Sequence, residues 1–253
     1  MKVIAIIRCA RNFEPLAERC KKSFQYFHPD IDVECAYADD WREFMKDMGI
    51  YGIGNGKDFM YTATFVSYLR MCIDKYELVI NLDSDAVVTG RLDEMLVGDY
   101  FIGVSQSALL NYYNGGVWSS TSKEFARTNL NLNLHSYFCE NWSFVQLVNY
   151  YKGVGKIIKV LDDVDKKVWY NERSRQWWDR LSIKDDKLYT PDREVKILHW
   201  AGGMGWGLEK RMSCSLFSDE VKQWLNKITD GTTFTDYDGV EFGNYLRSYY
   251  GLG

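Results

Sequence analysis

The segment Leu78–Val88 reads LVINLDSDAVV, an apolar run that ends in two aspartates separated by one serine. The run from Leu78 to Leu82 predicts a buried strand. Because burying an unpaired carboxylate is strongly unfavourable, Asp83 and Asp85 need a positively charged partner. A divalent metal ion is the natural candidate, since hard cations bind carboxylate oxygens. A strand end followed by a solvated turn would give the same short pattern.

Length and composition indicate that the 253 residues form one large globular domain, or one domain with an elaborated C-terminal part. The aromatic content of 16% is high, which suits a large core and also flat surfaces for sugar rings or bases. The net charge of −4 gives no overall field that would attract nucleic acid. The net charge therefore does not indicate a nucleic acid as the substrate that accepts a transferred group, although it leaves that option open.

Cysteine usage and the apolar profile indicate the compartment. Six cysteines are scattered without a CxxC pair, which fits neither a disulfide framework nor a zinc site. The chain starts with the strand-like segment Val3–Ile7 instead of a signal peptide, and no stretch is long enough to span a membrane. We expect buried thiols, no integral membrane segment and a cytoplasmic location.

The first forty residues predict a β-α-β unit. Apolar runs at Val3–Ile7 and Ile31–Tyr37 predict strands, and Glu14-Pro15 predicts the start of the helix between them. This unit is the usual opening of a nucleotide-binding α/β fold, in which ligands lie beyond the carboxyl ends of the strands. Arg8 and Arg11 follow the first strand and are therefore expected near a nucleotide.

Further elements follow by the same reasoning. Helices are expected at 59–73 and 92–96 and after the capping or opening residues Ser122, Glu140 and Ser218, and strands at 100–104, 157–160 and 195–198. In Asn114-Gly115-Gly116-Val117 the glycines lie beside an apolar run, which indicates a backbone that another group approaches closely.

Three polar points that each follow an apolar strand are predicted to converge at one edge of the sheet. They are the Asp83/Asp85 pair, Asn114 and His199, which ends the last predicted strand. Two carboxylates and an imidazole suit Mn²⁺ or Mg²⁺ with positions left open for phosphate oxygens. A lone histidine after a strand is more often structural than a metal ligand. The three points together therefore indicate a metal site more specifically than any one of them does.

The sequence resembles metal-dependent GT-A glycosyltransferases, in the group that includes glycogenin, galactinol synthase and bacterial lipopolysaccharide galactosyl- and glucosyltransferases. The resemblance covers roughly residues 1–210. It rests on Leu82-Asp83-Ser84-Asp85 (the DxD motif), Asn114-Gly115-Gly116-Val117 (Asn-x-Gly-Val), Glu140-Asn141-Trp142-Ser143 with Gln146 (an acidic segment beside the acceptor) and His199-Trp200-Ala201-Gly202 (His-x-x-Gly).

The resemblance implies a fold and a division of the chain. The fold would be α/β of the GT-A type, with a Rossmann-like, mixed but mostly parallel sheet flanked by helices. The whole chain, 1–253, would form a single glycosyltransferase domain. Residues 1–110 would bind the nucleotide sugar, and residues 111–253 would form the acceptor half and the C-terminal helices.

The resemblance also implies roles for individual residues. Asp83, Asp85 and His199 would hold the metal, and Glu140 and Asn114 would face the transferred sugar or the acceptor as catalytic residues. Donor contacts would come from Arg8, Arg11, Arg70, Asp83, Ser84, Gly202 and Lys210. One position departs from the family. Its members place a pyrophosphate-binding lysine shortly after the last motif, where this chain has Gly205, and Lys210 is the first basic residue beyond it.

These features predict transfer of a sugar from a nucleoside diphosphate sugar, expected to be a UDP-sugar, to a hydroxyl of a glycan or another acceptor. A divalent metal would bridge the diphosphate and offset the charge that grows on the leaving group. The family layout slightly favours retention of anomeric configuration. An inverting enzyme would need a carboxylate base, for which Glu140 is the best candidate.

Three other functions are compatible with parts of the sequence. A haloacid-dehalogenase-like phosphatase would use Asp83 as nucleophile, although its Asp-x-Asp motif normally lies on the first strand of the domain. A sugar nucleotidyltransferase would carry a glycine-rich basic signature after the first strand, which this chain lacks. A non-catalytic nucleotide-sugar-binding module on the same fold would keep the aspartates for binding alone.

Overall fold

The computed structural model describes residues 1–47, 58–97, 102–107, 112–135, 140–161, 168–172, 177–200, 212 and 214–231. Structural statements below concern these residues. None of the helices in these ranges is long and apolar enough to cross a membrane.

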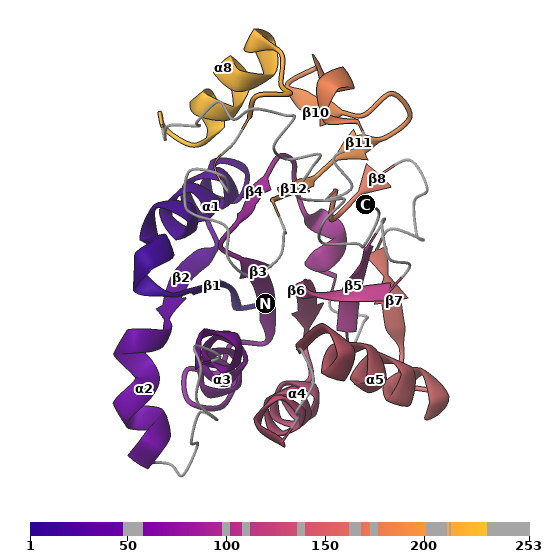
Figure 1. Cartoon of the computed structure of the whole chain (residues 1–253). Helices are drawn as coiled ribbons and strands as arrows, with labels where there is room; N and C mark the ends of the chain where they lie inside the picture. Colours follow the sequence, from indigo (N-terminus) through magenta and orange to yellow (C-terminus); the bar gives the residue numbers. More distant parts are fainter. Residues whose placement is uncertain are drawn as a thin grey trace, which may run out of the picture.

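A six-stranded sheet forms the centre, in the order β2-β1-β3-β6-β5-β7 (Figure 1). Its strands are β1 (Val3–Cys9), β2 (Asp32–Tyr37), β3 (Leu78–Asp83), β5 (Ile102–Ser107), β6 (Tyr112–Ser120) and β7 (Ile158–Val160). Strand β1 is parallel to β2 and β3, and β5 is parallel to β7, whereas β6 is antiparallel to both of its neighbours. The predicted mixed, mostly parallel sheet is confirmed.

Five predicted helices are present, and a sixth was not expected. They are α1 (Glu14–Phe27), α3 (Asp58–Cys72), α4 (Lys123–His135), α5 (Glu140–Gly153) and α8 (Asp219–Ile228), together with the unexpected α2 (Ala38–Asp47). Ser122 and Ser218 each accept a hydrogen bond from a backbone N–H in the first helical turn, as their capping role predicts. Short 3₁₀ turns lie at η1 (Arg11–Phe13), η2 (Asp93–Met95) and η3 (Trp178–Arg180).

The strands bury alternate side chains on the two faces of the sheet, as the two-residue period of a strand requires. Ile4 and Ile6 of β1 join a core cluster with apolar residues of α3, α4 and α5. Ala5 and Ile7 point the other way and pack in a second cluster with residues of α1. Helices therefore flank both faces of the sheet, as predicted.

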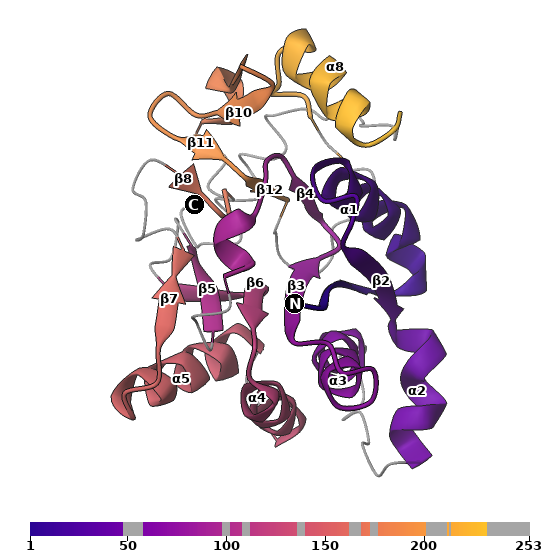
Figure 2. The same ribbon diagram turned by 180° about the vertical axis from the view of Figure 1, so that it is seen from behind.

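Two smaller sheets lie beyond the carboxyl end of β3 (Figure 2). One pairs β4 (Ala86–Val88) with β12 (Ile197–His199), and the other has the order β8 (Val168–Trp169), β11 (Glu194–Val195), β10 (Lys187–Tyr189) and β9 (Ser182–Lys184). The single strand predicted at 195–198 is thus divided between β11 and β12. Buried side chains of these strands and of α8 form a third core cluster.

The cysteines only partly match the expectation of buried thiols. All five described cysteines are free, and Cys9, Cys20 and Cys214 are buried. Cys35 is half-buried and Cys72 is exposed, so the prediction is wrong for Cys72, which lies in the last turn of α3. Cys139 lies outside the described residues.

Candidate functional site

The site forms where β3 leaves the central sheet. Asp83 is the last residue of β3, and Asp85 lies in the turn before β4. Strand β4 then pairs with β12, so that His199 lies opposite Ala86. The backbone N–H of Trp200 donates to the carbonyl oxygen of Asp85 at 2.8 Å, which holds the end of β12 against the turn.

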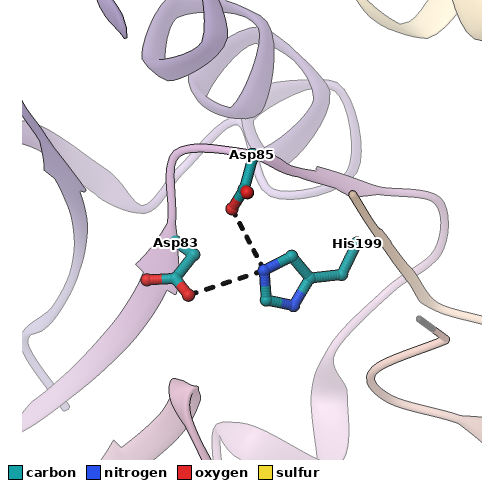
Figure 3. Close-up of side chains that lie close together, drawn as sticks. All are labelled: Asp83, Asp85 and His199. Atoms are coloured by element: carbon teal, nitrogen blue, oxygen red, sulfur yellow. Dashed lines mark hydrogen bonds and ion pairs between the residues drawn. The ribbon is translucent and has the colours of Figure 1, made fainter. Parts of the chain in front are cut away.

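Asp83, Asp85 and His199 converge as predicted (Figure 3). One oxygen or nitrogen atom from each residue lies within 4.8 Å of the others. The Nε2 atom of His199 is 3.1 Å from Asp85 Oδ1 and 3.5 Å from Asp83 Oδ2. His199 and Asp85 are buried, and Asp83 is partly exposed. A single ring nitrogen therefore faces both carboxylates.

Gly116 allows this arrangement by lying directly against Asp83. Strand β6 pairs with β3 so that Leu82 lies beside Val117, which brings Gly116 next to Asp83. A Cβ atom on Gly116 would be 2.0 Å from Asp83 Oδ2. The close approach predicted for the two glycines is confirmed for Gly116, and the approaching group is the Asp83 carboxylate.

Asn114 reaches the site by a different route from the one expected. It does not follow a strand but lies inside β6, and it comes near Asp83 because β6 runs antiparallel to β3. Its Oδ1 atom accepts hydrogen bonds from the Gly116 N–H at 3.0 Å and from Asn171 Nδ2 at 3.1 Å. Asn171 Oδ1 in turn lies 2.8 Å from His199 Nδ1.

This chain of hydrogen bonds determines which nitrogen of His199 keeps its proton when the imidazole is neutral. The Gly116 N–H can only donate, so the Asn114 atom that it meets is the oxygen. Asn171 must therefore present its NH₂ group to Asn114 and its oxygen to His199, which requires a proton on Nδ1. In the neutral imidazole the lone pair then lies on Nε2, between the two aspartates.

Asn171 is the site residue that the sequence did not reveal. It lies 28 positions from His199 and 57 from Asn114 along the chain, in a short segment without periodicity. The segment is held beside β12 because the Glu172 N–H donates to Ile197 O and the His199 N–H donates to Glu172 O. Asn171 itself is fully buried.

Burial and charge act in opposite directions on the cluster. Burial tends to raise the pKa of Asp83, but the positive charge of Arg8 and the hydrogen bond from His199 outweigh it and lower the pKa below the usual aspartate value. For His199, burial favours the neutral form, but the charge of Asp85 outweighs burial and raises the pKa. Asp83 is therefore stabilised as an anion, and His199 as the imidazolium that donates to it from Nε2.

Arg8, expected near the nucleotide, forms an ion pair with the Oδ1 atom of Asp83. The two residues are register partners on the parallel strands β1 and β3. They line a small pocket together with Thr64, Asn81 and Gly116.

The other predicted site residues do not join this cluster within the described part of the chain. Arg11 binds Asp40 at 2.7 Å at the ends of β1 and β2, and Arg70 binds Glu34 and Asp74. Ser84 lies near the thiol of Cys9, and burial raises the pKa of that thiol to about 12. Glu140 begins α5, but its side chain lies outside the described residues, as do Gly202 and Lys210.

No family model matches the sequence, and no curated protein matches it. The structure is similar to the apo-form glycosyltransferase GlyE of Streptococcus pneumoniae TIGR4, with a TM-score of 0.51 and 16% identity over 93% of this chain and 65% of that chain. It is also similar to a glycosyltransferase involved in glycosylation of the major capsid of PBCV-1, with a TM-score of 0.53 and 10% identity over 83% and 96% of the two chains. The chain thus has the GT-A fold of these glycosyltransferases.

Proposed function

We propose that the protein is a metal-dependent glycosyltransferase that uses a nucleoside diphosphate sugar, in the first instance a UDP-sugar. The observation that carries the proposal is the convergence of Asp83, Asp85 and His199 at the carboxyl end of β3 in a GT-A fold. Fold alone does not specify chemistry, so the proposal rests on this cluster.

The three side chains fit a divalent metal ion such as Mn²⁺ or Mg²⁺. They offer two carboxylate oxygens and one imidazole nitrogen within 4.8 Å of one another. In the neutral imidazole that metal binding requires, the Asn114–Asn171 hydrogen bonds leave the lone pair of His199 on the atom that faces the acids. When bound, the ion would act as a Lewis acid toward the diphosphate oxygens of the donor.

The chain's own residues would bind and orient the two substrates. Arg8 lies beside Asp83 and lines the same pocket, where its positive charge would attract the phosphate oxygens of the donor. Cleavage of the glycosidic bond leaves negative charge on the diphosphate, which these cationic groups would stabilise. With retention, which we favour slightly, a phosphate oxygen of the leaving group would accept the proton of the acceptor hydroxyl. With inversion, Glu140 would accept it.

A thermal-shift screen of nucleotide sugars, with and without Mn²⁺, tests the proposal. A ligand that binds only the folded protein raises its melting temperature, so one nucleotide sugar with Mn²⁺ should stabilise the wild type. Asp85→Asn should lose this stabilisation and the transfer activity. Asp179→Asn, which changes an exposed aspartate in η3, should keep both.

The outcomes separate the alternatives. If no nucleoside diphosphate or nucleotide sugar binds, the proposal fails. A phosphoryl group trapped on Asp83 would favour a phosphatase, and nucleotide-sugar binding without turnover on any acceptor would favour a binding module. Full transfer activity in the presence of a chelator would refute the metal requirement while leaving glycosyl transfer standing.

A further inference from the structure

The small pocket beside Asp83 lies on the face of β3 that α3 covers. Alternate side chains of a strand point to the same face, and Val79 of β3 packs in one core cluster with apolar residues of α3. Asn81 and Asp83 therefore lie on that face, and both line the pocket with Thr64 of α3. Because Oδ2 of Asp83 also faces His199, the pocket and the metal cluster share this carboxylate.

The orientation of the Asn81 amide is set by Ser67. The Ser67 hydroxyl donates to the carbonyl oxygen of Ala63 at 2.6 Å, and its oxygen is 2.7 Å from Asn81 Nδ2. A hydroxyl has one proton to donate, so Ser67 accepts from the NH₂ group of Asn81. Asn81 Oδ1 is then the acceptor that remains, and no hydrogen bond to it is formed within the described part of the chain.

The hydroxyl of Thr64 is the second polar group without a partner. Thr64 is only 3% exposed and Asn81 only 4%, and among the described residues nothing hydrogen-bonds with the Thr64 side chain. Ser67 on the same helix, by contrast, donates to the carbonyl four residues earlier. Neither oxygen is sealed from solvent, since the sealed and unpartnered side-chain atoms of the described residues belong to other positions. Both oxygens can therefore bond to a group that enters the pocket.

The two oxygens select the kind of group that fits. Asn81 Oδ1 can only accept, so it favours an O–H or N–H group and repels a phosphate oxygen. The Thr64 hydroxyl can donate or accept. A single hydroxyl can donate to Asn81 and accept from Thr64 at the same time, and the apolar walls formed by Ala63 and Trp118 leave little room for a larger group.

We propose that Thr64 and Asn81 form a subsite for one hydroxyl of the transferred sugar and that they determine which donor sugar is accepted. The proposal rests on the function proposed above and adds the residues that select the donor. A sugar attached to a diphosphate at Asp83 and Asp85 would lie next to the pocket, which both groups reach through Asp83. A donor without that hydroxyl would leave two buried oxygens unpaired, which is the strongest basis for rejecting an analogue.

Calorimetric titration at saturating Mn²⁺ with UDP, UDP-glucose, UDP-galactose and UDP-xylose tests the subsite. Thr64→Val replaces the hydroxyl with a methyl group and should weaken binding of the best UDP-sugar on the order of tenfold, while UDP binds as in the wild type. Thr64→Ser keeps the hydroxyl and should preserve both affinities. Thr62→Val is the matched control, because Thr62 is buried in the same helix and does not line the pocket. Its ratio of UDP-sugar to UDP affinity should stay at the wild-type value.

Asn81→Leu removes the acceptor and should also weaken the UDP-sugar and spare UDP. Thr64→Val decides the matter if Asn81→Leu does not fold. An equal loss for UDP and the UDP-sugar in Thr64→Val would place a ribose hydroxyl in the pocket and overturn the proposal, as would wild-type affinity for both. In either case the wild type still binds the UDP-sugar, so the proposed function stands. A wild type that binds neither UDP nor any UDP-sugar would refute the proposed function together with the subsite.

Discussion

Gly116 illustrates how one missing side chain shapes the site. Its Cα occupies the space beside Asp83 Oδ2 so closely that any Cβ would overlap with the carboxylate. The Gly116 N–H also starts the hydrogen-bond chain that reaches His199 through Asn114 and Asn171. The residue therefore sets both the position of one acid and the orientation of the imidazole.

We expect Gly116→Ala to reduce Mn²⁺ affinity and transfer activity by about 10–100-fold, the usual effect of disturbing groups that orient metal ligands. The cause would be displacement of Asp83 by the new methyl group. Gly153→Ala at the end of α5 is the matched control, because nothing lies within 4 Å of its added Cβ. Calorimetry with Mn²⁺ measures the effect, and equal affinities for the two variants would contradict it.

Asn171 acts on the site through its hydrogen bond with His199. We expect Asn171→Ala to weaken Mn²⁺ binding by about 10–100-fold, because the imidazole loses the acceptor that keeps its proton on Nδ1. The ¹⁵N chemical shifts of His199 should change from one dominant tautomer to a mixture. A merely structural role would leave the tautomer as it is. Asn226→Ala on the exposed face of α8 serves as the control.

At the scale of elements, the direction of β6 decides how the site is assembled. If β6 were parallel to β3, Asn114 near its start would lie at the opposite end of β3 from Asp83. The antiparallel pairing places the start of β6 beside the end of β3. The departure of β4 from the central sheet has a similar effect, since it lets β12 deliver His199 from a different sheet.

Helix α8 packs into the third core cluster. This cluster also contains Trp200, the residue after His199. Ser218 caps this helix by accepting a hydrogen bond from the Val221 N–H at 3.3 Å. Ser218→Ala should therefore lower the free energy of unfolding by about 1 kcal/mol, as for other N-cap losses, whereas Ser218→Asp should preserve it. Urea unfolding measures both values, and equal losses in the two variants would show that the cap is not the cause.

At the scale of the whole molecule, His28 links stability to pH. It is buried at the end of α1, where its Nε2 atom accepts a hydrogen bond from the Leu92 N–H at 2.9 Å. Burial lowers its pKa to about 4. The unfolded chain binds a proton near pH 6.5 and the folded protein does not, so this contribution to stability is complete above about pH 6.5 and is lost as the pH falls toward 4.

We expect the wild type to lose up to about 3 kcal/mol of unfolding free energy through His28 between these limits. His28→Gln keeps an acceptor for the Leu92 N–H but does not titrate, so its loss over the same range should be smaller by that amount. Urea unfolding at neutral pH and near pH 4.5 measures the difference. Parallel pH profiles for the two proteins would contradict the assignment to His28.

More of the fold than of the site could be predicted from the sequence. The strands β1, β2 and β3 were predictable because their apolar runs must be buried whatever surrounds them. Helix α2 was not predicted, because its sequence ADDWREFMKD has few apolar residues and only Ala38 and Met45 are buried among them. The close approach at Gly116 was predicted, but the group that makes the approach was known only once β6 was paired with β3.

The sequence by itself determined that two carboxylates end a buried strand and that a histidine ends another, because local apolar patterns define where strands stop. Only the tertiary structure showed that Arg8 pairs with Asp83, that Arg70 pairs with Glu34 and that Asn171 is hydrogen-bonded to His199. These pairings depend on strand order and register across long stretches of chain, which no local pattern encodes. The candidate ligand residues could thus be identified from the sequence. The charges and hydrogen bonds that set their protonation and orientation follow from the fold.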